Sequence, residues 1–377
     1  MVPNIKVIVV FLATLIGIFG CGHKIMEMET LQKRQTFGLK DVFFNDFLVG
    51  AAVNEQLISG KDSLALKLVA SEYNSISPEN VMKWMYIHPE PSLFNFEKAD
   101  SYIDLGVKNN LYTLGHTLVW HSQAPDYLNK VNDSAALARY LENHITTLVT
   151  RYKGRIAAWD VVNEALNEDG SLRQSVFLKY LGEDYIKMAF ELAEKADPGA
   201  HLIYNDYNLW KPEKRMGVVR LVKQLQDNGI KIDAVGLQGH WNLSEPSLAD
   251  IEQSIVTFNE LGLKVHFSEL DISVLPNPWD LVGADISQNF DENSYMNPYP
   301  KSIPDSVQMA LANRYQDIFR LFLKHRDKID RVTFWGISDQ GSWLNNWPIK
   351  GRVNYPLLFD RHFNPKMAYD SIVALKL

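Results

Sequence analysis

The feature that most constrains the fold is an eightfold alternation of short apolar runs with helix-length segments. The apolar runs are rich in branched and aromatic residues and are too short for helices, so they predict buried strands. The segments between them place apolar residues three and four positions apart, which predicts amphipathic helices. The predicted strands are residues 47–53, 73–77, 112–120, 156–164, 201–206, 234–240, 263–271 and 331–339. Such alternation is typical of α/β folds with a parallel sheet.

The limits of two predicted helices are marked by capping and breaking residues. Ser247, followed three residues later by Asp250, is a capping-box start, and Gly262 is a stop. Pro212 opens the preceding helix, where a missing N–H costs nothing, and Gly229 closes it. Eight strand–helix units predict a (β/α)₈ TIM barrel forming a single catalytic domain. A doubly wound open sheet is the alternative, but no glycine-rich phosphate loop follows the first strand.

Composition narrows the class of partner. The chain has 377 residues with a net charge of −7, and nothing in this balance suggests a nucleic acid or an anionic membrane as partner, since either would call for a basic face. An uncharged substrate is compatible with this balance. The 18 Phe, 16 Tyr and 9 Trp residues supply flat apolar rings on which sugars stack, although most of them are expected in the core.

The N-terminus has the pattern of an export signal. Lys6 precedes an apolar run at 7–19 that is too short to span a bilayer, and Cys21, the only cysteine, follows it. The run resembles the lipobox of bacterial lipoproteins, in which the cysteine is acylated. We therefore expect a signal peptide at 1–20, the lipidated Cys21 with a tether at 21–37, and the catalytic domain at 38–377. The alternative, a cytosolic protein with one buried cysteine, leaves the apolar run unexplained.

These signals predict an exported bacterial lipoprotein, held to a membrane only by its lipid and facing the periplasm or the cell surface. One cysteine allows no intrachain disulfide. We expect a monomer without a separate carbohydrate-binding module.

Polar side chains gather where the predicted strands end. In a barrel of this type the active site is built at the carboxyl ends of the strands. The fourth strand ends in Asn163 and Glu164, and the seventh ends with Glu269 and Asp271. The other residues of this kind are Asn74, Glu79, Asn80, His116, Trp120, Asn205, Asp206, Gln238, His240, Trp335 and Asp339. Solvated strand ends would favour Ser, Thr, Lys and Glu, so this set predicts a functional site.

Two of these carboxylates suggest glycosidic bond cleavage. Strands four and seven lie three steps apart around an eight-stranded ring, so Glu164 and Glu269 are expected to face each other across its mouth. Such a pair can protonate one side of a bond while attacking the other. Their separation decides between a retaining and an inverting mechanism, and the sequence leaves that open. A structural ion pair is the alternative role for either residue.

The sequence predicts no catalytic metal and no other cofactor. His116 and His121 are five residues apart, which places them on opposite faces of an extended strand, and no His-Glu-x-x-His motif is present. The acids of the segment 273–304 also lack the spacing of a calcium-binding loop.

Six segments, in order along the chain, resemble the xylanases of glycoside hydrolase family 10. They are residues 77–84, 115–121, 159–164, 236–240, 268–271 and 334–336. The resemblance covers the chain from about Leu39. It implies a (β/α)₈ barrel that cleaves β-1,4-linked xylan internally, with retention of the anomeric configuration.

The resemblance also implies residue roles. Glu164 would be the acid/base and Glu269 the nucleophile, oriented by His240 with Asp271 behind it. Asn163 would bond the sugar 2-hydroxyl beside the reacting centre. The implied sugar contacts are Glu79, Asn80, Lys83, His116, Trp120, Gln123, Gln238, Trp335 and Trp343 on the glycone side, and Asn205 and Tyr207 toward the leaving group.

The segment 273–304 departs from a typical connection because it is long and rich in Pro, Asp and Asn. It is expected to shape leaving-group subsites or to accommodate decorated xylan, with Trp279, Tyr295 and Tyr299 as candidate sugar contacts. A rigid cap over the helices is the other interpretation.

The sequence thus predicts a lipid-anchored endo-β-1,4-xylanase whose partners are xylan and xylo-oligosaccharides. Two alternatives stay open. One is a β-1,4-glucanase or mixed-specificity hydrolase on the same scaffold, which would differ at the tryptophans. The other is a surface lipoprotein that binds glycan without cutting it, which would have no need of both acids.

Overall fold

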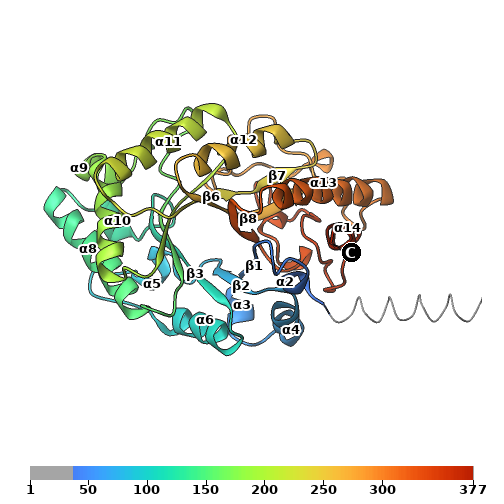
Figure 1. The fold of residues 1–377 in the computed structure, drawn as a ribbon, viewed down its shortest axis with the longest axis horizontal. Helices are drawn as coiled ribbons and strands as arrows, with labels where there is room; N and C mark the ends of the chain where they lie inside the picture. Colours follow the sequence, from blue (N-terminus) through green and yellow to red (C-terminus); the bar gives the residue numbers. More distant parts are fainter. Residues whose placement is uncertain (1–36, 377) are drawn as a thin grey trace, which may run out of the picture.

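The computed structural model describes residues 37–376, which form a closed barrel of parallel strands (Figure 1). Neighbouring strands follow the order β6-β5-β4-β3-β2-β1-β9-β8-β7, and pairing of β6 with β8 closes the ring. The strands are β1 Leu48–Val53, β2 Ser75–Pro78, β3 Tyr112–Trp120, β4 Ala158–Asn163, β5 His201–Tyr207, β6 Ala234–Gln238, β7 His240–Asn242, β8 Lys264–Ser273 and β9 Ile329–Phe334. The predicted (β/α)₈ barrel is confirmed. The predicted sixth strand is divided at Gly239 into β6 and β7, which both pair with β8.

Helices surround the barrel and connect consecutive strands (Figure 1). The longer ones are α4 Ser63–Glu72, α6 Glu97–Lys108, α8 Ser134–Arg151, α10 Asp184–Ala196, α11 Pro212–Asp227, α12 Leu248–Asn259, α13 Asp305–Lys324 and α14 Met367–Val373. The shorter ones are α2 Leu39–Val42, α3 Glu55–Ile58, α5 Trp84–Ile87, α7 Asp126–Asn129, α9 Val176–Leu181, and the 3₁₀ turns η1 Ser294–Met296, η2 Asp339–Gly341 and η3 Trp343–Asn345. Within residues 37–376, no helix combines the length and the apolar character needed to cross a membrane.

The helix signals act as predicted. The Ser247 side chain accepts from the backbone N–H of Asp250 at the start of α12, and Pro212 occupies the first turn of α11. Gly229 and Gly262 adopt positive φ angles of 69° and 80° just after these helices, where residues other than glycine are strained.

Two predicted strand-end residues lie elsewhere. β9 stops at Phe334, and Asp339 lies in η2, where it is fully buried, pairs with Lys366 Nζ at 2.8 Å and accepts from Leu357 N. Asn74 precedes β2, and its side chain accepts from Val49 N. Asp339 and Asn74 therefore stabilise the fold. Local composition alone could not distinguish the start of a strand from its end or fix the end of β9.

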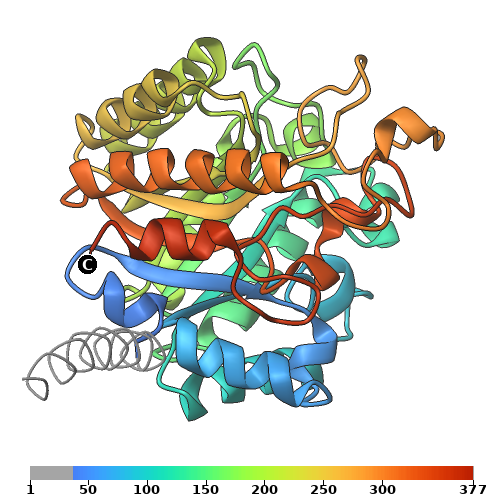
Figure 2. The same cartoon turned by 90° about the vertical axis from the view of Figure 1, so that its right-hand side faces the viewer.

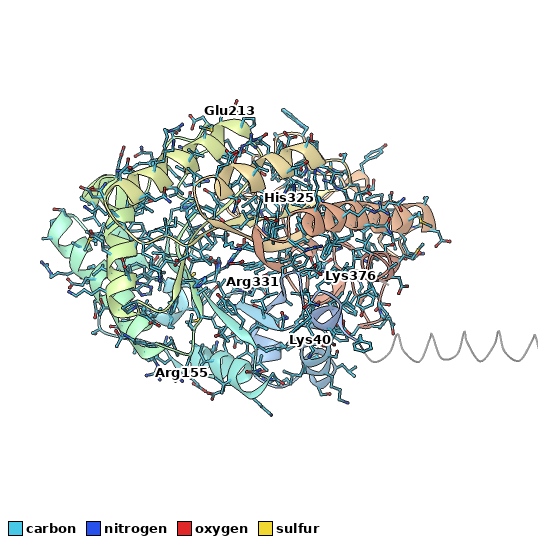
Figure 3. The ribbon with its side chains drawn as sticks, in the orientation of Figure 1. Lys40, Arg155, Glu213, His325, Arg331 and Lys376 are labelled. Carbon is cyan, nitrogen blue, oxygen red and sulfur yellow. The ribbon has the colours of Figure 1, made fainter. Side chains whose placement is uncertain are left out.

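The barrel interior contains charged groups as well as the apolar residues expected of a core. Arg331 lies inside the ring, 1% exposed, and donates to Ser77 Oγ at 2.7 Å, whereas Lys40 and Arg155 lie on the outside (Figure 3). Toward the carboxyl ends of the strands, the inward-pointing side chains are the polar residues of the site described next.

The segment between β8 and α13 is long, as predicted, and rises at one end of the barrel (orange in Figure 2). The predicted signal peptide, Cys21 and tether up to residue 36 lie outside the described residues.

Candidate active site

A pocket opens at the carboxyl ends of the strands. It brings together side chains from most strands of the ring, including both glutamates that the sequence singled out. Its lining comprises Glu79, Asn80, Lys83, His116, Trp120, Gln123, Asn163, Glu164, Gln238, His240, Glu269, Ala284, Ile286, Trp335 and Trp343.

Glu269, on β8, is held in a charged environment. Its Oε2 lies 3.2 Å from His240 Nε2, and the other ring nitrogen of His240 lies 3.0 Å from Asp271 Oδ1. Burial would lower the pKa of His240, but the charge and hydrogen bond of Asp271 raise it to about 10, so the imidazolium persists at neutral pH. Burial would raise the pKa of Glu269, but the hydrogen bond from His240 and the nearby His116 hold it below its usual range. Glu269 is therefore ionised, as a nucleophile must be.

Glu164, at the end of β4, has a pKa that is shifted upward, opposite to that of Glu269. Burial, together with the negative charges of Asp206 and Glu269, raises its pKa to about 7, although hydrogen bonds from Gln238 and Trp120 oppose the shift. Gln238 Nε2 donates to one carboxyl oxygen at 3.0 Å and Trp120 Nε1 to the other at 2.8 Å. A carboxyl group that is protonated up to neutral pH can act as a general acid.

Glu164 also adopts a conformation that side chains rarely occupy. Its φ is +55°, in the left-handed region, which is unfavourable for a residue other than glycine. The neighbouring hydrogen bonds hold this backbone in place: Glu164 N donates to Asn205 O at 2.9 Å. The turn brings the carboxyl group from the strand end into the pocket.

A chain of side-chain amides joins the two acids. Asn205 Nδ2 donates to Glu269 Oε1 and to Asn163 Oδ1, both at 2.9 Å, and Gln238 Nε2 lies 3.3 Å from the same Asn163 oxygen and 3.0 Å from Glu164. The Asn163 oxygen is thus used within the protein, and these bonds do not involve its Nδ2. We call this series the amide chain.

Gly236 on β6 makes room for the amide chain. A Cβ atom at this position would lie 2.2 Å from Asn205 Oδ1, so a larger residue would displace the Asn205 side chain. The same Asn205 oxygen accepts from Ser268 Oγ at 2.6 Å, which fixes the direction of the amide.

One wall of the pocket is polar and internally bonded. Lys83 Nζ donates to Asn80 Oδ1 at 3.0 Å and to Gln123 Oε1 at 2.8 Å, and it lies 4.9 Å from the centroid of the Trp120 ring. Burial lowers the pKa of Lys83, and Glu269 and Glu79 oppose the shift. His116, nearby, is paired with buried Asp160 at 2.8 Å.

Two tryptophans form the adjoining wall. Trp343 donates from Nε1 to Asp271 Oδ2 at 2.7 Å and packs edge-on against His240, with centroids 4.8 Å apart. Trp335 makes edge contacts with His116 and His240. Both rings line the pocket and narrow it beside the acids.

Comparison with known proteins places this geometry in a family. The model of glycosyl hydrolase family 10 matches residues 38–375. The chain belongs to glycoside hydrolase family 10. "Endo-1,4-beta-xylanase A" of Xylanibacter ruminicola is 42% identical to this family 10 chain over 342 residues, which cover 89% of the chain and 93% of that protein. The "Beta-1,4-xylanase" of Dictyoglomus thermophilum is 41% identical over 337 residues, covering 89% and 90%.

Solved structures of family 10 xylanases are also similar to this chain. A GH10 endoxylanase retrieved from a sugarcane soil metagenome is 44% identical, with a TM-score of 0.87 and coverage of 90% of the family 10 chain and 100% of that structure. Xylanase 10B from Thermotoga petrophila RKU-1, solved in complex with xylobiose, is 30% identical with a TM-score of 0.79, covering 90% and 97%.

Two of the predicted sugar contacts of the family 10 enzyme, Asn205 and Tyr207, are buried and do not line the pocket. Asn205 is fully buried, and its amide bonds to Glu269, Asn163 and Ser268, so it orients Glu269 within the protein. Tyr207 is 3% exposed and does not line the pocket. Sequence spacing locates the ends of strands, but it does not reveal what covers the side chains found there.

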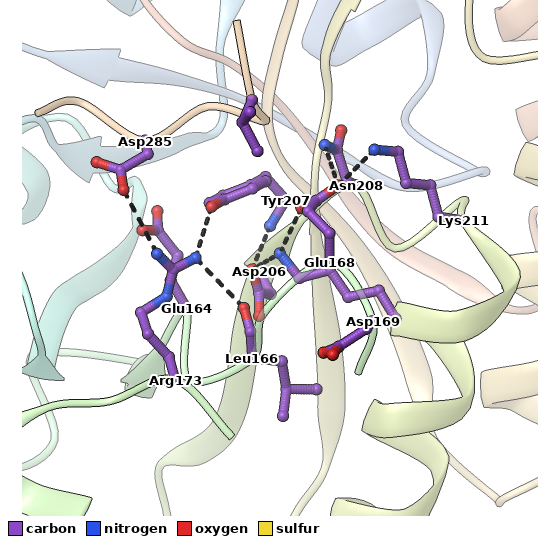
Figure 4. A network of polar contacts seen from close by, with 12 residues as sticks. Glu164, Leu166, Glu168, Asp169, Arg173, Asp206, Tyr207, Asn208, Lys211 and Asp285 are labelled. Atoms are coloured by element: carbon purple, nitrogen blue, oxygen red, sulfur yellow. Dashed lines mark hydrogen bonds and ion pairs between the residues drawn. The ribbon is translucent and has the colours of Figure 1, made fainter. Parts of the chain in front are cut away.

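Sequence reasoning gave no role to a second group of charges next to Glu164 (Figure 4). Asp206 and Lys214 form a fully buried ion pair at 2.8 Å, and Arg173 donates to the Tyr207 hydroxyl at 2.6 Å. The position of Asp206 could be predicted, because it follows Asn205 at the end of the same strand. Lys214 lies on α11, and Arg173 lies in the segment after β4. No sequence pattern in either segment indicated that these residues would lie beside the active site.

The two histidines considered for a metal have separate environments. His116 is bonded to Asp160, while burial and the charge of Arg173 lower the pKa of His121 to about 4. Among residues 37–376 no group of three or more His, Cys, Asp or Glu side chains is arranged to hold a metal ion.

Proposed function

We propose that this family 10 enzyme is an endo-1,4-β-xylanase that cleaves xylan and xylo-oligosaccharides with retention of anomeric configuration. The observation that carries the proposal is that the pKa values of two glutamates in one pocket are shifted in opposite directions. The pKa of Glu269 is lowered, while that of Glu164 is raised to about 7. One carboxylate is therefore ready to attack while the other carries a proton to give.

In the first step, the Glu269 carboxylate attacks the anomeric carbon, and Glu164 protonates the departing glycosidic oxygen. The negative charge of Glu269 is lost when the glycosyl–enzyme ester forms. One of the influences that raise the pKa of Glu164 then disappears, so Glu164 can accept a proton from the attacking water. Water releases the sugar with its original configuration and restores both acids.

His240 and the amide chain are positioning groups in this scheme. His240, protonated through Asp271, stabilises the ionised nucleophile, and Asn205 fixes one of its oxygens. The Asn163 amide supplies a donor for the 2-hydroxyl of the sugar at the reacting centre, a contact that strengthens in the transition state. The polar wall around Lys83 and the two tryptophans would hold the glycone.

The substrate assignment has separate support. The Xylanibacter ruminicola and Dictyoglomus thermophilum relatives are named as xylanases, and the Thermotoga petrophila structure contains xylobiose. Trp335 and Trp343 narrow the pocket where the hydroxymethyl group of a glucose unit would lie, which favours xylose polymers.

The deciding experiment follows the anomeric proton signals while a soluble form, residues 22–377, cleaves xylohexaose. We expect the β-anomer to appear first and then decay to the equilibrium mixture. Initial α-anomer would exclude Glu269 as a nucleophile, and binding without cleavage would indicate a glycan-binding protein. Faster cleavage of cello-oligosaccharides than of xylo-oligosaccharides would assign a glucanase.

We also propose that the protein is exported and anchored through lipid on Cys21, facing the periplasm or the cell surface. The support is the sequence pattern of residues 1–21 alone. Membrane fractionation of cells expressing the full chain tests it, since Cys21→Ser should move the enzyme to the soluble fraction. Retention of that variant in the membrane fraction would contradict the anchor.

A further inference from the structure

The long segment between β8 and α13 reaches the active site at only a few residues. Ala284 and Ile286 line the pocket, whereas Trp279 and Tyr295 are 94% and 84% exposed and lie outside the pocket lining. The pocket-facing part, which we call the loop bar, is residues 283–286. Its two lining side chains are apolar and offer a sugar neither hydrogen bonds nor an aromatic face.

The loop bar lies directly against Tyr207. A Cβ atom on Gly283 would lie 2.6 Å from the Tyr207 ring, and Gly283 has a φ of +61°, so the backbone reaches the ring only because this residue is glycine. Lys214 Nζ lies 3.6 Å from the ring centroid and covers a face of the same ring. With 3% of the residue exposed, Tyr207 has no free face on which a sugar could stack.

Arg173 fastens the loop bar to the segment after β4 (Figure 4). Its guanidinium donates to the Tyr207 hydroxyl at 2.6 Å and to Leu166 O at 3.3 Å, and it lies 3.5 Å from Asp285 Oδ2. The Asp285 carboxylate also accepts from Ser287 N at 2.9 Å. Breaking the Arg173–Asp285 ion pair would release the loop bar without touching either catalytic glutamate.

Other contacts hold the rest of the long segment. Arg352 donates to Pro276 O at 2.9 Å, and Phe290 N donates to Pro348 O at 3.0 Å. The loop bar is therefore supported on both sides, and its position over Tyr207 is built into the fold.

The loop bar lies on the leaving-group side. Glu164 donates its proton to the departing oxygen, so the leaving group lies next to Glu164. Arg173 and Tyr207 lie close enough to this glutamate for its charge to act on both, and Arg173 pairs in turn with Asp285 (Figure 4). Trp335 and Trp343, in contrast, pack against His240, the partner of Glu269, and Glu269 is the carboxylate whose charge acts most strongly on Lys83 of the polar wall.

We propose that the loop bar is a specificity element that withdraws Tyr207 from sugar binding. Leaving-group sugars then gain little binding energy, and the bond that is cut is chosen by filling the glycone side. Xylo-oligosaccharides are cleaved near their reducing ends, with short leaving groups. This inference rests on the proposed xylanase activity and concerns which bond is cut, not whether cleavage occurs.

The test uses reducing-end ¹⁸O-labelled xylohexaose, with the masses of the labelled fragments counted early in the reaction. The wild-type enzyme should release mainly labelled fragments of one or two sugars. Predominant release of labelled trimer would overturn the proposal while leaving the xylanase assignment intact. Absence of cleavage would count against the proposed function itself.

Two variants open the loop bar in different ways. Asp285→Asn removes the ion pair to Arg173, and Gly283→Ala forces the backbone off the Tyr207 ring. Each should raise the ratio of central to near-end cleavage about threefold or more, because one aromatic face becomes available. Activity on an aryl xylobioside, whose leaving group needs no subsite, should stay within about twofold.

Asp291→Asn is the matched control, since Asp291 is an exposed acid in the same segment. Its cleavage pattern should equal that of the wild type. If Asp285→Asn and Gly283→Ala both fold and also keep the wild-type pattern, the loop bar does not choose the bond and the proposal fails.

Discussion

On the glycone side of the two glutamates, the pocket wall consists of charged, amide and tryptophan side chains that bond to one another. Lys83, for example, donates to both Asn80 and Gln123 and lies over the ring of Trp120. On the leaving-group side, Arg173 bonds to Tyr207 and pairs with Asp285, and the pocket is lined instead by Ala284 and Ile286.

This difference between the two sides shows that a polar residue near the site is not necessarily one that a substrate can contact. Both sides are rich in groups that could bind sugar. The polar groups line the pocket only on the glycone side; on the other side Arg173, Asp285 and Tyr207 do not line it, and Ala284 and Ile286 do. The following predictions test this contrast, beginning with the acids that divide the two sides.

The largest effect is expected for Glu269→Ala. Removal of the nucleophile should lower kcat on xylan by about 10⁴-fold or more. Azide or formate should partly restore cleavage of an activated aryl xyloside, because a small anion can occupy the vacated space. Glu260→Ala, at an exposed glutamate, is the control. Absence of rescue in a folded variant would contradict the nucleophile role and thus the division of the site.

Glu164→Ala should lower turnover of xylan by about 10³-fold while retaining binding. The effect should be much smaller with an aryl xyloside whose leaving group needs no proton. Because the pKa of Glu164 is about 7 and the acid must be protonated, wild-type kcat/KM should fall as pH rises through about 7. This basic limb should disappear in Glu164→Ala on the activated substrate, and its persistence would assign the limb to another group.

His240→Asn should lower kcat by about 10²-fold by removing a charged donor to the nucleophile. The imidazolium keeps the pKa of Glu269 low, so its loss raises that pKa. Since Glu269 must be ionised, the acidic limb of the pH profile should move to higher pH. His362→Asn, at an exposed histidine, should leave the limb in place. An equal loss of activity at every pH would indicate a purely structural role.

The smallest effect is expected for Trp279→Ala, because this ring is 94% exposed and does not line the pocket. The kcat/KM on xylan should change by less than about twofold, whereas Trp343→Ala on the glycone side should lower it more than tenfold. A comparable loss in both variants would mean that sugars do bind along the exposed part of the long segment.

The barrel and its two acids could be predicted from sequence because they follow from periodicity and from the ends of strands. Asn163 and Glu164 terminate an apolar run, and Glu269 terminates another. The roles of Asn205 and Tyr207 could not be predicted in this way. Whether they meet sugar depends on Ser268, Gly283 and Lys214, which are distant in sequence and carry no local pattern.

Asp339 illustrates the same limit in the fold. It follows an apolar run, as Glu164 does, yet it pairs with Lys366 from the segment before α14 and supports the last turns of the chain. A carboxylate beside a strand is equally compatible with catalysis and with a buried ion pair, and only the tertiary partner distinguishes the two.

The amide chain between Glu269 and Glu164 has one more consequence. Its links, Asn205, Asn163 and Gln238, neither gain nor lose protons at any pH at which the enzyme could work. The spacing of the two carboxyl groups is thus maintained by neutral spacers while the groups themselves change charge. When Glu269 gains a proton in acid or Glu164 loses one in alkali, these three links therefore keep the same charge and the same donor and acceptor groups.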